Sequence, residues 1–184
     1  MIKVYVDTNL VGHNLRTLAV DHPEEHQALA TLRLRETAGE ISIVTSAVCT
    51  REVNATRDPA VRAELLRDAD ALQKIVPDEK VLGFQTFQDQ YGGMSVCPLV
   101  SDVQDEEALA RLERCTLSRR DAEHIAQAIA SKCLFFLTHD VRTILSPERR
   151  ARVQQTFLIK LVKPSELEAE CRLRFLTLYN RAAG

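Results

Sequence analysis

The chain has 184 residues, of which 45% are hydrophobic and 27% charged, with a formal net charge of −2. This length suits one domain with a sizeable core, and the composition is that of a globular protein. The small net charge excludes a general attraction to polyanions, so any binding of nucleic acid has to use a local basic patch.

The cysteines and the apolar runs also exclude several classes of protein. Five cysteines, an odd number without CxxC spacing, argue against a zinc site or a disulfide framework and favour a reducing compartment. No run approaches the roughly 18 apolar residues of a membrane span, and the N-terminus lacks the basic region and long apolar core of a signal peptide. We therefore predict a cytoplasmic protein with no membrane segment.

The first part of the chain alternates between short apolar runs and stretches with helical spacing. The apolar runs are bounded by polar or turn residues, as expected of buried strands. Gly39 ends the helical pattern that precedes the second run. In chain order we predict the strand Ile2–Val6, helices over Leu10–Val20 and Pro23–Glu36, the strand Ile41–Thr45, and helices over Ala47–Ala55 and Pro59–Leu72.

The segment Pro77–Ser101 has no regular period, because Gly83, Gly92 and Pro98 interrupt it. We predict an irregular excursion that contains one short helix, Leu82–Gln88.

Regular patterning returns in the last part of the chain. Ala122, Ile125, Ala126 and Ile129 form an i, i+3, i+4, i+7 stripe, whose alanines let a helix lie close to a sheet. Strands that alternate with helices indicate an α/β fold with parallel strands and right-handed crossovers. In chain order we predict helices over Glu106–Cys115 and Ser118–Lys132, the strand Leu134–Leu137, a helix over Pro147–Gln155, the strand Phe157–Val162, and a final helix from Pro164 to Tyr179.

Four acidic residues stand where a strand ends or a helix begins: Asp7, Glu52, Asp121 and Asp140. The carboxyl ends of parallel strands lie along one edge of a sheet, where ligands bind. Four carboxylates at one edge repel one another, so a cation is expected between them. Because carboxylates offer oxygen ligands only, the sequence predicts Mg²⁺ or Mn²⁺.

Each acid also has a purely structural interpretation. Asp7 is suited to an Asx turn or a helix cap, and Asp140 can cap the turn that follows it. Asp121 stands three residues after Ser118, as in a capping box. Glu52 can be a solvated helix residue. The functional interpretation rests on the joint occurrence of all four acids in a βα framework.

These segments together resemble the PIN domain family of metal-dependent ribonucleases over nearly the whole chain. The combination is more specific than any one of its parts. The matching segments are the strand that ends in Asp7-Thr8-Asn9, the strand and helix Ile43–Glu52, the Ala-rich helix Asp121–Ala130, the strand Phe136–Asp140, and the last strand Leu158–Val162, which runs into Pro164-Ser-Glu-Leu.

The resemblance implies one PIN-like domain over residues 1–184, with the excursion around 77–101 added to a small parallel sheet of about four strands sandwiched by helices. It implies that the four acids form a Mg²⁺ or Mn²⁺ site, with Asn9 and Thr138 as supporting polar groups. Many members are toxins of toxin–antitoxin pairs, and others process or degrade RNA. RNA is therefore the expected substrate, and an antitoxin or other protein partner and a homodimer are expected on the same ground.

Hydrolysis of a phosphodiester bond needs a nucleophile near neutral pH and neutralisation of the charge that builds up in the transition state. A metal ion can serve both needs. We expect Asp7 and Asp140 to contact the ion directly or through water. We expect Glu52 and Asp121 to complete its shell or to orient the attacking water, without a His or Lys base.

Three arginines adjoin these acids and are candidates for binding the substrate. Arg119 and Arg120 directly precede Asp121, and Arg142 follows Asp140 by two positions. The chain has six Phe, three Tyr and no Trp, so a platform for stacking bases is not evident. We predict binding through the RNA backbone.

Two other classes of protein share part of this pattern. One is a PIN-like interaction module that keeps the fold without cleaving, although the presence of all four acids argues against it. The other is a haloacid-dehalogenase-type phosphohydrolase, which also opens with a strand that ends in Asp. Its nucleophile motif has a second Asp two residues later, where this chain has Asn9.

Overall fold

A five-stranded sheet with all strands parallel runs through the molecule in the order β3-β2-β1-β6-β7. The computed structural model describes residues 1–12, 14–75, 82–88, 94–100 and 106–182, and of these only the backbone over 82–88, 94–100 and 175–182. The strands of this sheet are β1 (Ile2–Val6), β2 (Ile41–Thr45), β3 (Gln73–Lys74), β6 (Phe135–Leu137) and β7 (Lys160–Val162).

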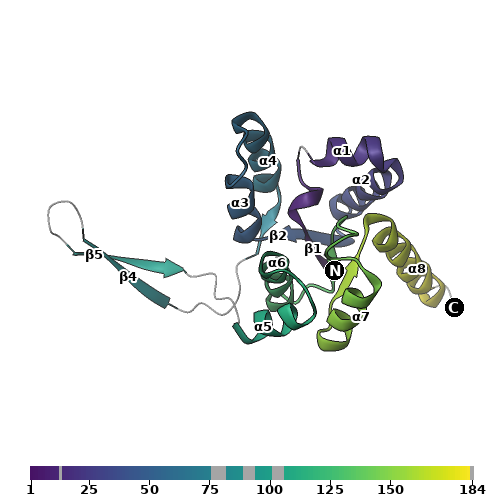
Figure 1. Cartoon of the computed structure of the whole chain (residues 1–184). Helices are drawn as coiled ribbons and strands as arrows, with labels where there is room; N and C mark the ends of the chain where they lie inside the picture. The colour runs from purple at the N-terminus through teal and green to yellow at the C-terminus, as the bar shows by residue number, and fades with distance from the viewer. Residues whose placement is uncertain (13, 76–81, 89–93, 101–105, 183–184) are drawn as a thin grey trace.

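Helices cover both faces of this sheet, so the molecule has three layers (Figure 1). Helices α1, α2, α3, α4 and α8 contribute to the hydrophobic core on one face, and α5, α6 and α7 to the core on the other. The predicted α/β fold class is therefore confirmed. The helices are α1 (Asn14–Asp21), α2 (Pro23–Thr37), α3 (Ala47–Asn54), α4 (Pro59–Ala71), α5 (Glu106–Arg114), α6 (Arg119–Ala130), α7 (Pro147–Thr156) and α8 (Pro164–Ala182), with a 3-10 turn, η1 (Thr8–Leu10), after β1.

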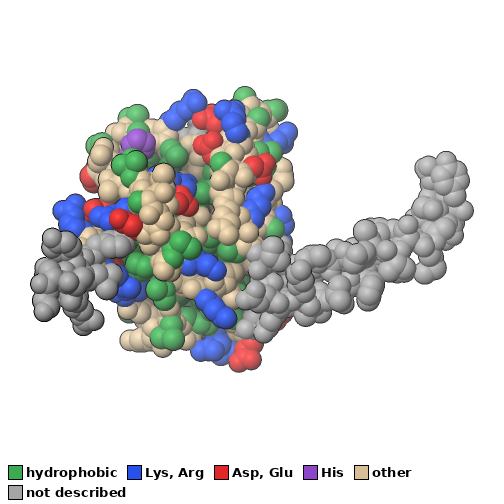
Figure 2. Space-filling model, turned by 180° about the vertical axis from the view of Figure 1, so that it is seen from behind, with side chains coloured by type: hydrophobic (Ala, Val, Ile, Leu, Met, Phe, Trp, Pro, Cys, Tyr) green, Lys and Arg blue, Asp and Glu red, His purple; other side chains and the backbone are tan. Residues whose placement is uncertain are grey.

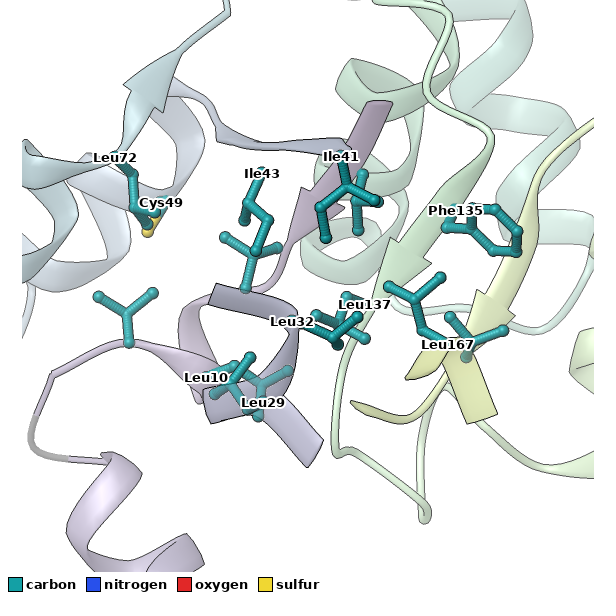
Figure 3. Close-up of a cluster of buried hydrophobic side chains, with 14 of the residues drawn as sticks. Leu10, Leu29, Leu32, Ile41, Ile43, Cys49, Leu72, Phe135, Leu137 and Leu167 are labelled. Atoms are coloured by element: carbon teal, nitrogen blue, oxygen red, sulfur yellow. The ribbon is translucent and has the colours of Figure 1, made fainter. Parts of the chain in front are cut away.

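The central strands are mostly apolar because both faces of the sheet are covered, and their polar side chains have hydrogen-bond partners, as Lys3 and Ser42 do. Successive side chains of a strand point to opposite faces. Val4 and Val6 accordingly lie in the first core and Tyr5 in the second, while Phe135 and Phe136 divide in the same way. Figure 3 shows the first core, where side chains from β1, β2 and β6 meet those of the helices. Burial of each large side chain stabilises the fold by about 1.5–3 kcal/mol.

The register of the strands brings their carboxyl ends together. Val4 pairs with Ile43 of β2 and with Phe135 of β6, so β1 is central. The ladder continues past the strand ends, because Asp7 N donates to Leu137 O at 2.9 Å. Asp7 therefore lies beside the end of β6, at the edge where the sequence predicted a site.

The prediction for residues 82–88 is wrong. Leu82–Gln88 is a strand, β4, which pairs antiparallel with β5 (Met94–Val100) in a separate two-stranded sheet. Figure 1 shows this hairpin apart from the main sheet. Gly83 and Pro98 suggested irregular structure, but each strand of a two-stranded ribbon has one unpaired edge, and there a proline without an N–H is tolerated. The rest of the predicted excursion lies outside the described residues.

Two smaller differences concern the sheet and the first helix. The sheet has a fifth strand, β3, which is two polar residues long and offers no apolar run to recognise. The predicted helix Leu10–Val20 is divided into η1 and α1, and Gly12 lies between them with a φ of +56°. A Cβ at Gly12 would lie 3.0 Å from the Cα of Leu65, so this turn needs glycine both for its φ and for its contact with α4.

In the described part of the chain, no helix has the length and apolar character that a membrane crossing requires.

Candidate active site

Asp7 lies at the carboxyl end of the central strand and is buried, with 7% of the residue exposed. Its Oδ1 accepts a hydrogen bond from Thr8 N at 2.7 Å, and its Oδ2 accepts one from Thr138 Oγ1 at 2.7 Å. Burial raises the pKa of Asp7, since a carboxylate out of water is destabilised. A cation beside this carboxylate would favour its ionised form.

Thr138 links the ends of β1 and β6. Besides donating to Asp7, its Oγ1 accepts hydrogen bonds from Asn9 Nδ2 at 2.8 Å and from Asp140 N at 3.1 Å. One donor and two acceptor positions are the full capacity of a hydroxyl. Asn9 Oδ1 also accepts from His139 N at 3.2 Å. Asn9 and Thr138 thus hold the carboxylate of Asp7 in place by hydrogen bonds.

Glu52 reaches the same place from α3, and its side chain is 16% exposed, so it is not a solvated helix residue. Its Oε1 lies 2.5 Å from Arg120 Nε, and its Oε2 lies 3.0 Å from His124 Nε2. Burial alone raises the pKa of Glu52, but His124, Thr8 and Arg120 together lower it to about 2. The carboxylate is therefore ionised at neutral pH.

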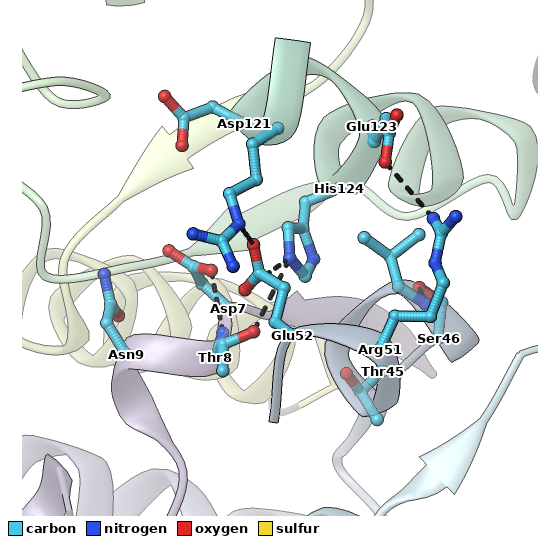
Figure 4. A network of polar contacts seen from close by, with 12 residues as sticks. Asp7, Thr8, Asn9, Thr45, Ser46, Arg51, Glu52, Asp121, Glu123 and His124 are labelled. Carbon is cyan, nitrogen blue, oxygen red and sulfur yellow. Dashed lines mark hydrogen bonds and ion pairs between the residues drawn. The ribbon is translucent and has the colours of Figure 1, made fainter. Parts of the chain in front are cut away.

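His124 of α6 completes the group, although the sequence did not single it out. Asp7, Glu52 and His124 each offer a ligand atom within 4.8 Å of the other two, and no further group of this kind occurs among the described residues. The histidine is 2% exposed. In the sequence, His124 stands among the apolar residues of α6, which was the available signal that its ring is buried. A buried polar side chain needs a polar partner. Figure 4 shows His124 beside Glu52 and Thr8.

Asp121 has a local partner at the start of α6. Ser118 caps this helix, and its Oγ accepts from Asp121 N at 3.2 Å and donates to Asp121 Oδ2 at 2.8 Å. These contacts are the ones that the capping interpretation of Asp121 predicts. Figure 4 shows Asp121 above Asp7 and Glu52, and its carboxylate does not belong to their group.

Asp140 caps its own turn after β6. Its Oδ1 accepts from Arg142 N at 2.9 Å and from Thr143 N at 2.7 Å, and its Oδ2 accepts from Thr143 Oγ1. Burial opposes ionisation, but the hydrogen bonds from Thr143 and Arg142 hold the pKa of Asp140 below its usual range. Like Asp121, Asp140 lies outside the group that Asp7 and Glu52 form with His124.

The two arginines before Asp121 have different contacts. Arg119 pairs with Glu106 at 3.1 Å and Glu113 at 3.4 Å, both on α5, and its Nε lies 3.6 Å from Glu123. Arg119 therefore joins α5 to α6. Arg120 instead pairs with Glu52 inside the candidate site, although its side chain is 64% exposed.

Arg142 is exposed, and so is the turn that carries it. A hollow of about 420 Å³ lies against this turn, lined in part by Asn9, His22, His139 and Asp140. Basic and acidic side chains are interspersed on the face shown in Figure 2. On that face, attraction of a polyanion would depend on individual basic side chains rather than on a large basic patch.

The donors of Asp7, Glu52 and His124 fit a divalent cation. Metal–ligand bonds of about 2.0–2.2 Å place opposite donors about 4–4.4 Å apart, so a span of 4.8 Å requires only small side-chain adjustments. Two carboxylates also balance the charge of such an ion. The structure thus brings two of the four predicted acids together, and the roles of all four remain predictions.

Comparisons with known proteins show a distant likeness to solved structures. No family model matches the sequence, and no curated protein matches it. Among solved structures, the chain is similar to the crystal structure of VapBC2 from Rickettsia felis bound to a DNA fragment from their promoter. The identity is 15%, the match covers 88% of this chain and 98% of that chain, and the TM-score is 0.45. A likeness at this level transfers neither an activity nor a residue role.

Proposed function

We propose that this protein is a metal-dependent nuclease of the PIN kind, which hydrolyses phosphodiester bonds of RNA with Mg²⁺ or Mn²⁺. The observation that carries the proposal is the convergence of Asp7, Glu52 and His124 at the carboxyl edge of a parallel sheet. Ligand sites of α/β sheets occur at this edge. The sequence resemblance to PIN domains supports RNA as the substrate class.

The residues divide the work of such a reaction between them. A divalent ion would supply charge neutralisation and an activated water molecule. Asp7 and Glu52 would hold it, and the hydrogen bonds of Thr138 and Asn9 keep Asp7 oriented. Asp121 and Asp140 remain in the proposal as carboxylates that orient water.

Arg120 and Arg142 would bind the phosphate groups of RNA beside the ion. Arg120 already balances the charge of Glu52 and is exposed enough to turn toward a substrate. Arg142 is exposed on the turn of Asp140. Guanidinium groups suit this task because they present several donors to a phosphate in a fixed geometry.

Cleavage of an end-labelled, single-stranded RNA with a stem-loop tests the proposal. We expect cleavage with Mn²⁺ or Mg²⁺, none in EDTA, and recovery when the metal is restored. Asp7→Asn, purified in parallel, controls for contaminating nucleases, because a contaminant would be unaffected by the substitution. Cleavage in metal-free buffer, or equal cleavage by Asp7→Asn, would contradict the proposal.

The same preparation separates the rival functions. Metal-independent RNA binding without cleavage would favour the interaction module. Hydrolysis of a small phosphomonoester in place of RNA would favour the phosphohydrolase. Asn9 argues against the phosphohydrolase, because it occupies the position where that class needs a second Asp. Its side chain forms hydrogen bonds with Thr138 and His139 instead.

Three further expectations belong to this proposal. They are a cytoplasmic location, an antitoxin or other protein partner, and a homodimer. Light scattering of the purified protein tests the last of these directly, and co-purification with the product of a neighbouring gene tests the partner.

A further inference from the structure

His124 is a buried histidine with a defined partner at each ring nitrogen. Its Nε2 lies 3.0 Å from Glu52 Oε2, and its Nδ1 lies 2.8 Å from Tyr5 Oη. Tyr5 Oη is also 2.7 Å from Ser46 Oγ, and both of these residues are buried. Ser46, Tyr5, His124 and Glu52 therefore form one chain of contacts that leads from the interior to the acid pair.

The chemistry of these groups determines the direction of the hydrogen bonds. The 3.0 Å contact between His124 Nε2 and Glu52 Oε2 places a hydrogen on Nε2, because a carboxylate only accepts. In a neutral ring Nδ1 then accepts from the hydroxyl of Tyr5, which in turn accepts from Ser46. Hydroxyl groups both donate and accept, so this chain can also run in the opposite direction if the ring hydrogen moves to Nδ1 and the two O–H bonds rotate.

The reversed chain is the arrangement that a metal-ligating histidine needs. A histidine that binds a metal through Nε2 carries its hydrogen on Nδ1 and usually donates it to a fixed acceptor. Tyr5 Oη is such an acceptor, at 2.8 Å and in the buried core. The switch between the two tautomers moves the ring hydrogen from Nε2 to Nδ1, with no net gain or loss of protons.

We propose that His124 Nε2 is the third protein ligand of the metal site, with Asp7 and Glu52, and that Tyr5 is its positioning residue. This rests on the proposed function insofar as the site is the same. An imidazole nitrogen suits the later first-row transition-metal ions best, and Mn²⁺, the weakest binder of that series, still accepts it more readily than Mg²⁺, which prefers oxygen ligands and water. The site therefore selects Mn²⁺ over Mg²⁺, which four carboxylates would not do to the same extent.

A purely structural role for His124 makes a different prediction. If the ring only supports Glu52 through a hydrogen bond, the bound ion has oxygen ligands alone, and His124 still donates from Nε2. The two roles therefore differ in one measurable property, which is the presence of a nitrogen atom in the coordination shell of the metal.

Pulsed electron paramagnetic resonance on the Mn²⁺-loaded full-length protein measures this property without reference to catalysis. We expect a hyperfine coupling from one imidazole ¹⁴N in the wild type, which changes to the ¹⁵N pattern after labelling with ¹⁵N-histidine. His22→Gln is the matched control, because His22 is an exposed histidine that lines the neighbouring hollow. It should retain the coupling.

Metal titrations of two variants extend the test. His124→Gln should lose the nitrogen coupling and bind Mn²⁺ at least about 10- to 100-fold more weakly, with a smaller loss for Mg²⁺. Tyr5→Phe keeps the ring and removes only the hydroxyl. It should retain the coupling and bind Mn²⁺ about 10- to 100-fold more weakly, the range that is typical of outer-shell partners.

Mn²⁺ bound to the wild type without a nitrogen coupling would overturn the inference, and so would the absence of Mn²⁺ binding. The wild-type measurement decides even if His124→Gln does not fold. RNA cleavage is scored separately. Nitrogen coupling without cleavage would remove the proposed function and leave the ligand assignment, whereas metal-dependent cleavage without coupling would do the reverse.

Discussion

Two pairs of acids lie near the carboxyl edge of the sheet, and they differ in their hydrogen-bond partners. Asp7 accepts a hydrogen bond from Thr8 of its own turn, but Asp7 and Glu52 also contact groups that are distant in the chain, namely Thr138, Arg120 and His124. Asp121 and Asp140 contact the backbone and hydroxyl groups of their own turns. A position at the carboxyl edge of a sheet therefore does not by itself bring a carboxylate into contact with distant groups.

The activity of single-acid variants should show this difference most strongly. We expect Asp7→Asn and Glu52→Gln to lower kcat/KM for RNA by more than about 100-fold, because each removes a carboxylate from the convergent group. Asp121→Asn and Asp140→Asn should cost about 10-fold, as is typical of residues outside the ligand shell. Circular dichroism establishes that each variant is folded. Equal losses of activity at all four positions would contradict this difference and support the four-acid site that the sequence predicts.

The two arginines before Asp121 extend the comparison to substrate binding. Arg120→Ala should weaken RNA binding by about 1.5–3 kcal/mol, roughly 10- to 150-fold, through loss of charged hydrogen bonds. It should also lower the salt dependence of binding by about one counterion. Arg119→Ala should have little effect on the affinity or on its salt dependence, because ion pairs with Glu106 and Glu113 hold the Arg119 side chain against α5.

Affinities measured at several salt concentrations in Ca²⁺, which should allow binding with little hydrolysis, provide this test. Arg120→Lys is the control for charge without the guanidinium group. Equal effects of Arg119→Ala and Arg120→Ala would mean that Arg119 leaves its glutamate partners when RNA binds.

Stability without metal should change in opposite directions for the two kinds of acid. The pKa of Asp7 is raised in the folded state, so its ionised form destabilises the fold at neutral pH. Asp7→Asn should therefore unfold at the same or a higher urea concentration in EDTA. Asp121→Ala should lose about 0.3–1 kcal/mol, because it removes an acid from a helix N-terminus. A strongly destabilised Asp7→Asn would show that the main role of this carboxylate is to stabilise the turn after β1.

Glu166 provides a small, pH-dependent example of an acid with one local partner, Lys163, and one partner on another helix, Arg150. It accepts hydrogen bonds from Lys163 N at 2.9 Å and Arg150 Nη1 at 2.9 Å. Burial opposes ionisation, but Arg150 and Lys163 lower the pKa of Glu166 below its ordinary value of 4.5. Its stabilisation is therefore complete above pH 4.5 and is lost as the pH falls through the lower, folded-state pKa.

Urea unfolding from pH 3 to pH 7 should show Glu166→Gln to be less stable at the upper end and equal to wild type at the lower end. The difference should stay below about 1 kcal/mol, because the side chain is 40% exposed and its ion pair is screened by solvent. A constant difference at all pH values would assign the effect to packing.

Short-range patterns in the sequence were sufficient for most of the fold. The bounds of β1 and β2 follow from two predominantly apolar runs, since a strand covered on both faces buries most of its side chains. The starts of α4, α7 and α8 follow from prolines at their first turns. Each of these signals lies within a few residues of the feature it determines.

Features that depend on hydrogen bonds between distant segments could not be predicted from such short-range patterns. β3 is only two polar residues long, and β5 is an apolar run that Pro98 interrupts, so both are recognised through pairing with a partner strand. The role of His124 depends on Tyr5 and Glu52, which reach it from two other elements.

The sequence by itself determined the fold class, the edge of the sheet where a site forms, and the acids that stand near it. Only the tertiary structure decided which acids converge, because Asp7 and Thr138 are 131 residues apart and meet only through the register of β1 and β6. Capping depends on neighbours three residues away, whereas convergence depends on atoms that the whole sheet brings together. Asp7 and Asp121 both bond a residue of their own turn, and only Asp7 gains a distant partner from the packing of the sheet.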